Sequence, residues 1–228
     1  MIPWFIRAVT GARARWSGIE PLDANGALPQ RIYFANHTSN LDAPVIWAAL
    51  PRLLRKRTRA VAARDYWEGG PVRRFLASRV FNAVLIERKK VTVSNNPMIA
   101  MEKVLDDGDS LIIFPEGARF TSDEGEMAEF KPGLWHLARK RPQAQLVPVH
   151  LENLNRIMPK GNLLIVPVLA SVTFGPPVTF NAAEPRGAFL ARARQAVAAL
   201  EDRGMGGEPA SAPSAPVAAT ADSTPEVS

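Results

Sequence analysis

Short apolar runs alternate with longer amphipathic segments along most of the chain. The runs at 32–35 and 111–114 are continuously apolar, which is typical of strands that are buried on both faces. We expect strands in residues 31–37, 59–63, 83–88, 110–114 and 144–151, with one or two more in 163–180. Helices are expected at 42–54, 64–67, 71–81, 95–108, 130–141 and 185–204. This order predicts an α/β domain with a largely parallel central sheet and helices on both faces.

The two ends of the chain depart from this pattern. Residues 1–17 place Trp4, Phe5 and Ile6 beside several arginines, which suits a short amphipathic helix in a membrane interface. The alternative is a surface helix that packs on the core. Residues 204–228 are rich in Ala, Pro and Ser and contain no aromatic residue, so we expect a disordered tail. Residues 18–203 are then the folded domain.

Composition excludes several classes of protein. The 228 residues suffice for one sizeable core or two small domains. The absence of cysteine excludes disulfides, thiolate metal sites and a cysteine nucleophile. The sequence has no apolar run long enough to span a membrane, and its first ten residues lack the order of a signal peptide. We therefore expect a cytoplasmic protein.

The charge favours a phosphate-bearing partner. The formal net charge is +6, and it rises to +9 without the tail, which holds three acids and no Lys or Arg. Such a basic body suits nucleic acid, an anionic membrane surface or a phosphorylated substrate. The basic run at 52–64 has no aromatic residues in its densest part, so we expect a solvated or membrane-facing surface rather than a nucleic-acid site.

His37 and Asp42 lie directly after the first strand expected above, in the stretch NHTSNLD. Ligands of parallel α/β sheets bind outside the carboxyl ends of the strands. A histidine is the natural general base near neutral pH, and a carboxylate on its other ring nitrogen fixes the tautomer and stabilises the imidazolium. The alternative is that Asp42 only caps or charges the start of the next helix, while His37 is an incidental loop residue.

A second polar group follows the strand at 110–114, in the stretch FPEGAR. Its turn supplies a carboxylate at Glu116 and close backbone approach at Gly117, and Arg119 can grip a phosphate with its planar guanidinium. The alternative is a sharp turn with a surface Glu–Arg pair.

Two smaller groups have the same character. Glu87 and Arg88 end the strand expected at 83–88, and Lys131 lies just ahead of a helix N-terminus, where anions bind. Charged clusters at three strand ends favour a binding site.

Other chemistries lack their residues. There is no G-x-S-x-G nucleophile elbow, no phosphate-binding G-x-x-x-x-G-K-[ST] loop and no G-x-G-x-x-G fingerprint. His136 and His150 show no paired ligand spacing, so we expect no metal site.

In combination, these blocks make the chain similar to the glycerolipid acyltransferase family, which includes the 1-acylglycerol-3-phosphate acyltransferases. The resemblance covers roughly residues 15–180, with the blocks in family order. They are N-H-x-x-x-x-D at Asn36, His37 and Asp42, an acid–arginine pair at Glu87 and Arg88, F-P-E-G-x-R at 114–119, F-K-x-G at 130–133 and V-P-V at 147–149.

Three positions depart from the family pattern. Asn82 replaces the glycine that usually leads the second block. Ala118 stands where the family has threonine, and Phe120 where it has serine. The loss of two hydroxyls beside the expected phosphate site leaves the head group of the acceptor open.

The resemblance implies a direct acyl transfer. His37, oriented by Asp42, would deprotonate a hydroxyl of the acceptor, and the oxygen would attack the thioester of acyl-CoA or acyl carrier protein without an acyl-enzyme intermediate. No cofactor is implied beyond this donor.

The resemblance also implies an anion-binding group. Arg88 and Arg119 would hold the acceptor phosphate, and Glu116 would orient Arg119 or accept a hydroxyl hydrogen bond at the Gly117 turn. Lys131 would support the same pocket, and Arg64 would replace a lysine that related enzymes carry.

We therefore expect an O-acyltransferase domain at 18–203 that makes phosphatidic acid from a lysophospholipid, at the inner face of the cell membrane and without a nucleic-acid partner. Three alternatives stay open. They are a different lysolipid or aminolipid acceptor, hydrolysis of the donor with water as acceptor, and a non-catalytic lipid-binding membrane adaptor.

Overall fold

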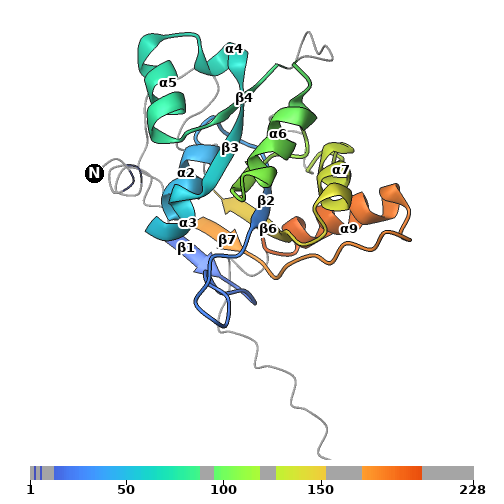
Figure 1. The fold of residues 1–228 in the computed structure, drawn as a ribbon. Coiled ribbons are helices and arrows are strands. Elements are labelled where there is room, and N and C mark those ends of the chain that lie inside the picture. Colours follow the sequence, from blue (N-terminus) through green and yellow to red (C-terminus); the bar gives the residue numbers. More distant parts are fainter. Residues whose placement is uncertain are drawn as a thin grey trace, which may run out of the picture.

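A computed structural model describes Pro3, Ile6 and residues 13–87, 95–118, 127–152 and 171–201. Its strands form one seven-stranded sheet in the order β1-β7-β6-β2-β5-β3-β4 (Figure 1). The strands are β1 (Arg13–Trp16), β2 (Arg31–Ala35), β3 (Thr58–Ala63), β4 (Val84–Ile86), β5 (Ser110–Ile113), β6 (Gln145–Glu152) and β7 (Ser171–Phe174). Neighbouring strands are parallel except β6 and β7, which confirms the largely parallel sheet.

Helices cover both faces of the sheet, as the alternating pattern predicted. In β2, Tyr33 and Ala35 face a core shared with α2, whereas Ile32 and Phe34 face a second core shared with α6, α7 and α9. Every side chain of β2 is therefore buried, which explains its continuously apolar centre. The helices are α2 (Asp42–Ala49), α3 (Arg52–Lys56), α4 (Arg64–Trp67), α5 (Pro71–Phe75), α6 (Pro97–Asp106), α7 (Gly133–Lys140) and α9 (Arg186–Ala198).

One helix expected from the sequence is interrupted, and another changes to a π-helical turn. The single helix predicted at 42–54 is wrong, because Pro51 forces the preceding Leu50 into an extended conformation (ψ 144°) and separates α2 from α3. The helix predicted at 71–81 continues from α5 into a π-helical turn at Leu76–Val80. The turn ends at Val80, and Asn82, two residues later, has a φ of 47°. Asn tolerates this left-handed conformation better than most residues, which explains why it can stand in place of the family's glycine.

The helix predicted for residues 1–17 is wrong at its end. Arg13–Trp16 form strand β1, which pairs in parallel with β7. Trp16 stacks on Phe174 with ring centroids 4.2 Å apart, so its ring covers the core instead of facing a membrane. Ile6 also packs against this core. The other residues of 1–12, the tail at 204–228 and a possible strand at 163–170 lie outside the described residues.

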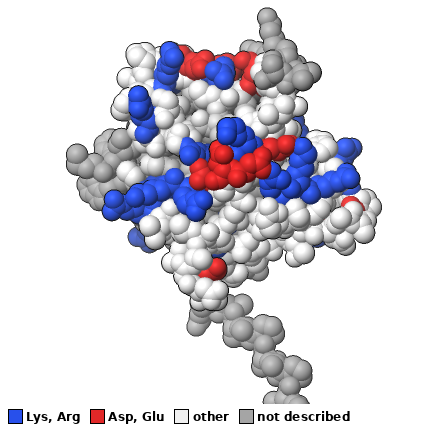
Figure 2. All heavy atoms as spheres, viewed as in Figure 1, with Lys and Arg blue, Asp and Glu red and all other residues white. Residues whose placement is uncertain are grey.

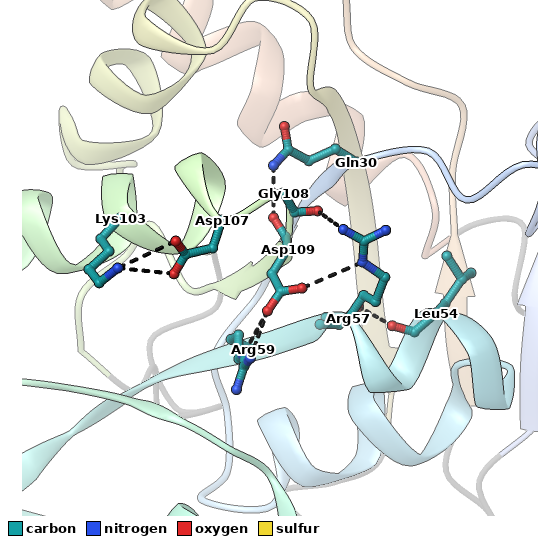
Figure 3. A network of polar contacts seen from close by, with 9 residues as sticks. Gln30, Leu54, Arg57, Arg59, Lys103, Asp107, Gly108 and Asp109 are labelled. Atoms are coloured by element: carbon teal, nitrogen blue, oxygen red, sulfur yellow. Dashed lines mark hydrogen bonds and ion pairs between the residues drawn. The ribbon is translucent and has the colours of Figure 1, made fainter.

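Paired charges join the segments at the amino-terminal ends of the parallel strands, which we call the amino-terminal edge of the sheet (Figure 3). Asp109, just before β5, receives Arg59 Nη2 at 2.7 Å and Arg57 Nε at 3.6 Å. Gln30, just before β2, donates to the carbonyl oxygens of Leu105 and Asp109. These contacts join the starts of β2, β3 and β5.

Further ion pairs connect α6 with its surroundings. Lys140 and Arg141 at the end of α7 pair with Glu102 and Asp106 of α6, and Lys103 pairs with Asp107. Figure 2 shows the resulting surface, where acidic side chains form a central band between clusters of Lys and Arg.

Candidate active site

The carboxyl ends of β2 and β5 lie side by side, because the two strands are parallel neighbours with Phe34 opposite Ile113. The loop that contains His37 and the turn that contains Glu116 therefore meet at one edge of the sheet. A cavity of about 340 Å³ opens there. Its lining is mostly apolar and comes from the ends of β3, β4 and β5 and from α4, α6 and α7, as shown by Ala62, Ile86, Phe114, Trp67, Met101, Leu134 and Leu137.

His37 lines this cavity and is bonded to Asp42. The distance between His37 Nδ1 and Asp42 Oδ2 is 2.8 Å. The same carboxylate oxygen accepts the backbone N–H groups of Thr38 (2.6 Å) and Ser39 (2.8 Å). Nε2 is thus the ring nitrogen available to a substrate.

Asp42 organises the loop that precedes α2, although it is itself the first residue of that helix. Its hydrogen-bond donors lie before the helix, and Leu41 at the N-cap makes no capping bond through its side chain. Asp42 is fully buried. Burial raises the pKa of Asp42, although His37 and the amides of Ser39 and Thr38 oppose this rise. The alternative reading of Asp42 as a helix cap does not fit this geometry.

Glu116 holds the loop of His37, a contact that the sequence did not predict. Its Oε1 accepts the backbone N–H of His37 at 2.8 Å, and its side chain is not among the residues that line the cavity. Glu116 is 4% exposed, and burial raises the pKa of its carboxyl group. Oε2 of Glu116 and Oδ1 of Asp42 are buried without a hydrogen-bond partner among the residues that the structure describes.

Gly117 lets Lys131 approach the turn closely. The φ of Gly117 is 72°, and a Cβ atom there would lie only 2.5 Å from Lys131 Nζ. Lys131 also donates its backbone N–H to the carbonyl of Pro115 at 2.9 Å. The FPEG turn and the segment before α7 therefore form one unit, and Lys131 and Gly117 both line the cavity.

Two residues of the sequence blocks have roles that sequence reasoning missed. Phe114 stacks on the His37 imidazole, with ring centroids 4.3 Å apart and an interplanar angle of 23°. Asn36 exchanges two hydrogen bonds with the backbone of Leu151 in β6, at 2.8 and 3.0 Å. Both residues belong to the sequence blocks named above, and this membership could have marked them as candidates for the site.

The structure describes only some of the remaining predicted residues. Glu87 lines the cavity, while Arg88 and Arg119 lie outside the described residues. Arg64 begins α4, pairs with Glu68 at 2.8 Å and is not among the lining residues. A role for Arg64 in binding substrate therefore stays a prediction.

No group of three or more His, Asp or Glu side chains in the described parts of the chain could hold a metal ion. Within the same parts, no helix has the length and apolar character needed to cross a membrane.

The fold and the site define an α/β protein with a His–Asp pair over a largely apolar cavity. The model of the Acyltransferase family matches residues 15–168, so the chain belongs to the acyltransferase family.

A curated relative and a solved structure are also similar. The chain is 29% identical over 104 residues to a probable 1-acyl-sn-glycerol-3-phosphate acyltransferase of Mycoplasma genitalium. That alignment covers 46% of this chain and 37% of the relative. The crystal structure of the 1-acyl-sn-glycerophosphate acyltransferase PlsC from Thermotoga maritima matches with a TM-score of 0.68 and 20% identity, over 91% of this chain and 80% of that one. This likeness confirms the predicted fold class.

Proposed function

We propose that the protein transfers a fatty acyl group from acyl-CoA or acyl carrier protein to the hydroxyl of 1-acylglycerol-3-phosphate and thereby forms phosphatidic acid. The observation that carries this proposal is the His37–Asp42 pair, bonded at 2.8 Å beside a largely apolar cavity. The named activities of the two similar proteins support the choice of substrates.

The reaction needs one proton transfer and one displacement. His37 Nε2 removes the proton of the acceptor hydroxyl as its oxygen attacks the thioester carbonyl. The carbon–sulfur bond then breaks, and the imidazolium returns the proton to the thiolate that leaves. The Asp42 carboxylate accepts the hydrogen bond of Nδ1–H, and its negative charge stabilises the imidazolium that forms when the hydroxyl loses its proton.

The cavity suits both parts of such substrates. Apolar side chains of β3, α6 and α7 offer a place for an acyl chain, for example Val61, Met101 and Leu137. Lys131 supplies a cation at the polar end, and Arg88 and Arg119 are the candidates for gripping the acceptor phosphate.

Glu116 has a positioning role in this proposal. By accepting the backbone N–H of His37, it fixes the loop from which the imidazole projects. Its negative charge also lies near the imidazolium that forms during the reaction, and it adds to the stabilisation that Asp42 provides.

A second candidate is acylation of a different lysolipid or an aminolipid. The observation that favours it is the substitution of Ala118 and Phe120 for the family's hydroxyl residues. A hydroxyl lost beside the head group would change its recognition without changing the base.

A panel of acceptors separates these candidates. The purified protein is supplied with acyl-CoA or acyl carrier protein as donor and with lysophosphatidic acid, other lysophospholipids, an aminolipid or water as acceptor. The proposal predicts the highest kcat/KM for lysophosphatidic acid. Faster transfer to another lipid would favour the second candidate, and release of free fatty acid alone would favour hydrolysis. Binding of lipid without turnover would indicate a non-catalytic adaptor.

A further inference from the structure

We propose that helix α5 docks the protein on an anionic lipid surface beside the cavity. Val72 and Phe75 of this five-residue helix are 69% and 58% exposed. They are two of only four large hydrophobic side chains that are exposed in the described parts of the chain; the other two are Leu53 and Ile99. Exposed aliphatic and aromatic side chains that share one helix indicate an interaction surface.

Val72 and Phe75 lie on one side of the helix, because residues three apart are neighbours on a helical surface. The next turn, Leu76–Val80, holds the segment to the core, because Ala77 is fully buried and Leu76 and Val80 are partly buried, whereas Val72 and Phe75 stay more than half exposed. The two apolar side chains therefore face away from the protein. Nothing in the described residues covers them.

The charges around these side chains select an anionic partner. Arg73, Arg74 and Arg79 flank them, and no acidic residue occurs between Glu68 and Glu87. Arg74 and Arg79 are exposed, and neither forms an ion pair with any residue that the structure describes. Apolar side chains between free arginines suit the headgroup region of an anionic bilayer, where rings and aliphatic groups enter the interface and guanidinium groups meet phosphates.

The helix is tied to the wall of the cavity. Arg73 donates to the carbonyl oxygens of Tyr66 (3.2 Å) and Gly69 (3.3 Å) and lies over the Tyr66 ring at 5.0 Å. Tyr66 and Trp67 of α4 line the cavity. In Figure 1, α4 and α5 lie together at the top, far from α3 and β1. Contact of α5 with a bilayer would therefore bring the cavity next to the lipids. That this position helps a lipid substrate to reach the cavity rests on the proposed function.

The test measures binding to vesicles without any substrate. Full-length protein and a Val72→Ser/Phe75→Ser variant are sedimented with vesicles of phosphatidylcholine mixed with phosphatidylglycerol, or of phosphatidylcholine alone. We expect a partition coefficient on mixed vesicles that is lower by about tenfold or more for the variant. Arg74→Gln/Arg79→Gln should reduce binding to the mixed vesicles and leave the weak binding to phosphatidylcholine unchanged.

Two control variants locate the effect. Leu53→Ser removes a side chain that is 56% exposed on α3. Helix α3 precedes β3, whereas α4 and α5 follow it, so Leu53 lies at the other end of this strand and the variant should bind like the parent protein. Trp4→Ser/Phe5→Ser tests the N-terminal segment. If this variant lost binding while Val72→Ser/Phe75→Ser kept it, the proposal would be wrong.

Activity assays separate this inference from the proposed function. Transfer to lysophosphatidic acid embedded in vesicles should fall more in the Val72→Ser/Phe75→Ser variant than transfer to a short-chain, monomeric acceptor. If the Val72→Ser/Phe75→Ser variant loses vesicle binding and the parent protein shows no transferase activity, the docking surface is upheld and the proposed function is refuted. Unchanged vesicle binding by the Val72→Ser/Phe75→Ser variant would overturn the docking surface.

Discussion

The amino-terminal and carboxyl-terminal edges of the central sheet differ in whether their charged side chains have ion-pair partners. At the amino-terminal edge, Asp109 meets two arginines, and Gln30 satisfies the carbonyl groups beside it (Figure 3). At the carboxyl-terminal edge, Asp42 and Glu116 are almost fully buried, no Lys or Arg pairs with them among the described residues, and each keeps one unpaired oxygen.

This difference indicates which edge the fold uses for stability and which for chemistry. The Asp109 pairs are partly buried, so they contribute more to stability than exposed pairs do, and they leave no charge unsatisfied. Buried carboxylates without a full set of partners cost stability and have raised pKa values, which is typical of functional sites. Variants at one edge should therefore change activity, and variants at the other should change stability.

The largest loss of activity outside His37 itself is expected for Asp42→Asn. The Asn side-chain oxygen can still accept the N–H groups of Thr38 and Ser39, but it carries no charge to stabilise the imidazolium. We expect kcat to fall by roughly 10²–10⁴. Because burial raises the pKa of Asp42, its charge disfavours the native state at neutral pH, and thermal unfolding should show a Tm that is not lowered. A lower Tm with normal kcat would reverse the assignment of this edge.

A smaller loss is expected for Glu116→Gln, on the order of tenfold in kcat. Gln can still accept the His37 N–H, but the negative charge that stabilises the imidazolium is gone. The acidic limb of the kcat–pH profile should then move to lower pH, while the KM for both substrates changes little. Glu116→Ala, which also loses the hydrogen bond, should have lower activity than Glu116→Gln. Equal profiles for the parent protein and Glu116→Gln would rule out the electrostatic part of this role.

At the opposite edge, Asp109→Ala should lower the free energy of unfolding by about 1–2 kcal/mol, since Arg57 and Arg59 both lose their partner. Acyl transfer at a temperature below the transition should be unchanged. Lys103→Ala is the matched control, because the Lys103–Asp107 pair is more than half exposed on both sides and should contribute under about 0.5 kcal/mol. Urea unfolding measures both variants. A kcat defect in Asp109→Ala would show that the edges are coupled.

The smallest effect concerns His150, a buried residue of β6 that does not line the cavity. Burial lowers the pKa of His150 below its usual 6.5, against the charges of Glu201 and Glu152. The unfolded chain therefore binds a proton that the native state resists, so this residue makes stability fall as the pH drops below about 6.5. His150→Gln should lose less stability than the parent between about pH 7.5 and 5.5 in urea unfolding. An identical acid dependence would contradict this.

The fold could be predicted largely because of its periodicity. Strands such as β2 and β5 are buried on both faces, and their short apolar runs are typical of such strands. The errors arose where local geometry decides. Pro51 divides a helix because it forces the residue before it into an extended conformation. In Arg13–Trp16, polar and apolar residues alternate as in a strand, but the stretch is so short that only its pairing with β7 identifies it as one.

The site was predictable as a set of blocks but not as a set of contacts. His37 and Asp42 are five residues apart, so their pairing follows from a short loop. The bond between His37 and Glu116 joins residues 79 positions apart and depends on β2 and β5 being neighbours. No pattern in the sequence states this neighbourhood, so Glu116 was expected to orient Arg119 or to accept a hydroxyl hydrogen bond, and its bond to the His37 backbone was not foreseen.

Single-turnover acyl transfer by His37→Ala tests the central claim most directly. His37 stacks on Phe114 at the cavity and contributes little to the core, so the variant should fold, as far-UV circular dichroism can verify. With acyl-CoA and lysophosphatidic acid, we expect the rate of phosphatidic acid formation to fall by at least 10²-fold, with unchanged affinity for the donor. A folded His37→Ala protein that forms phosphatidic acid at the parent rate would contradict the account.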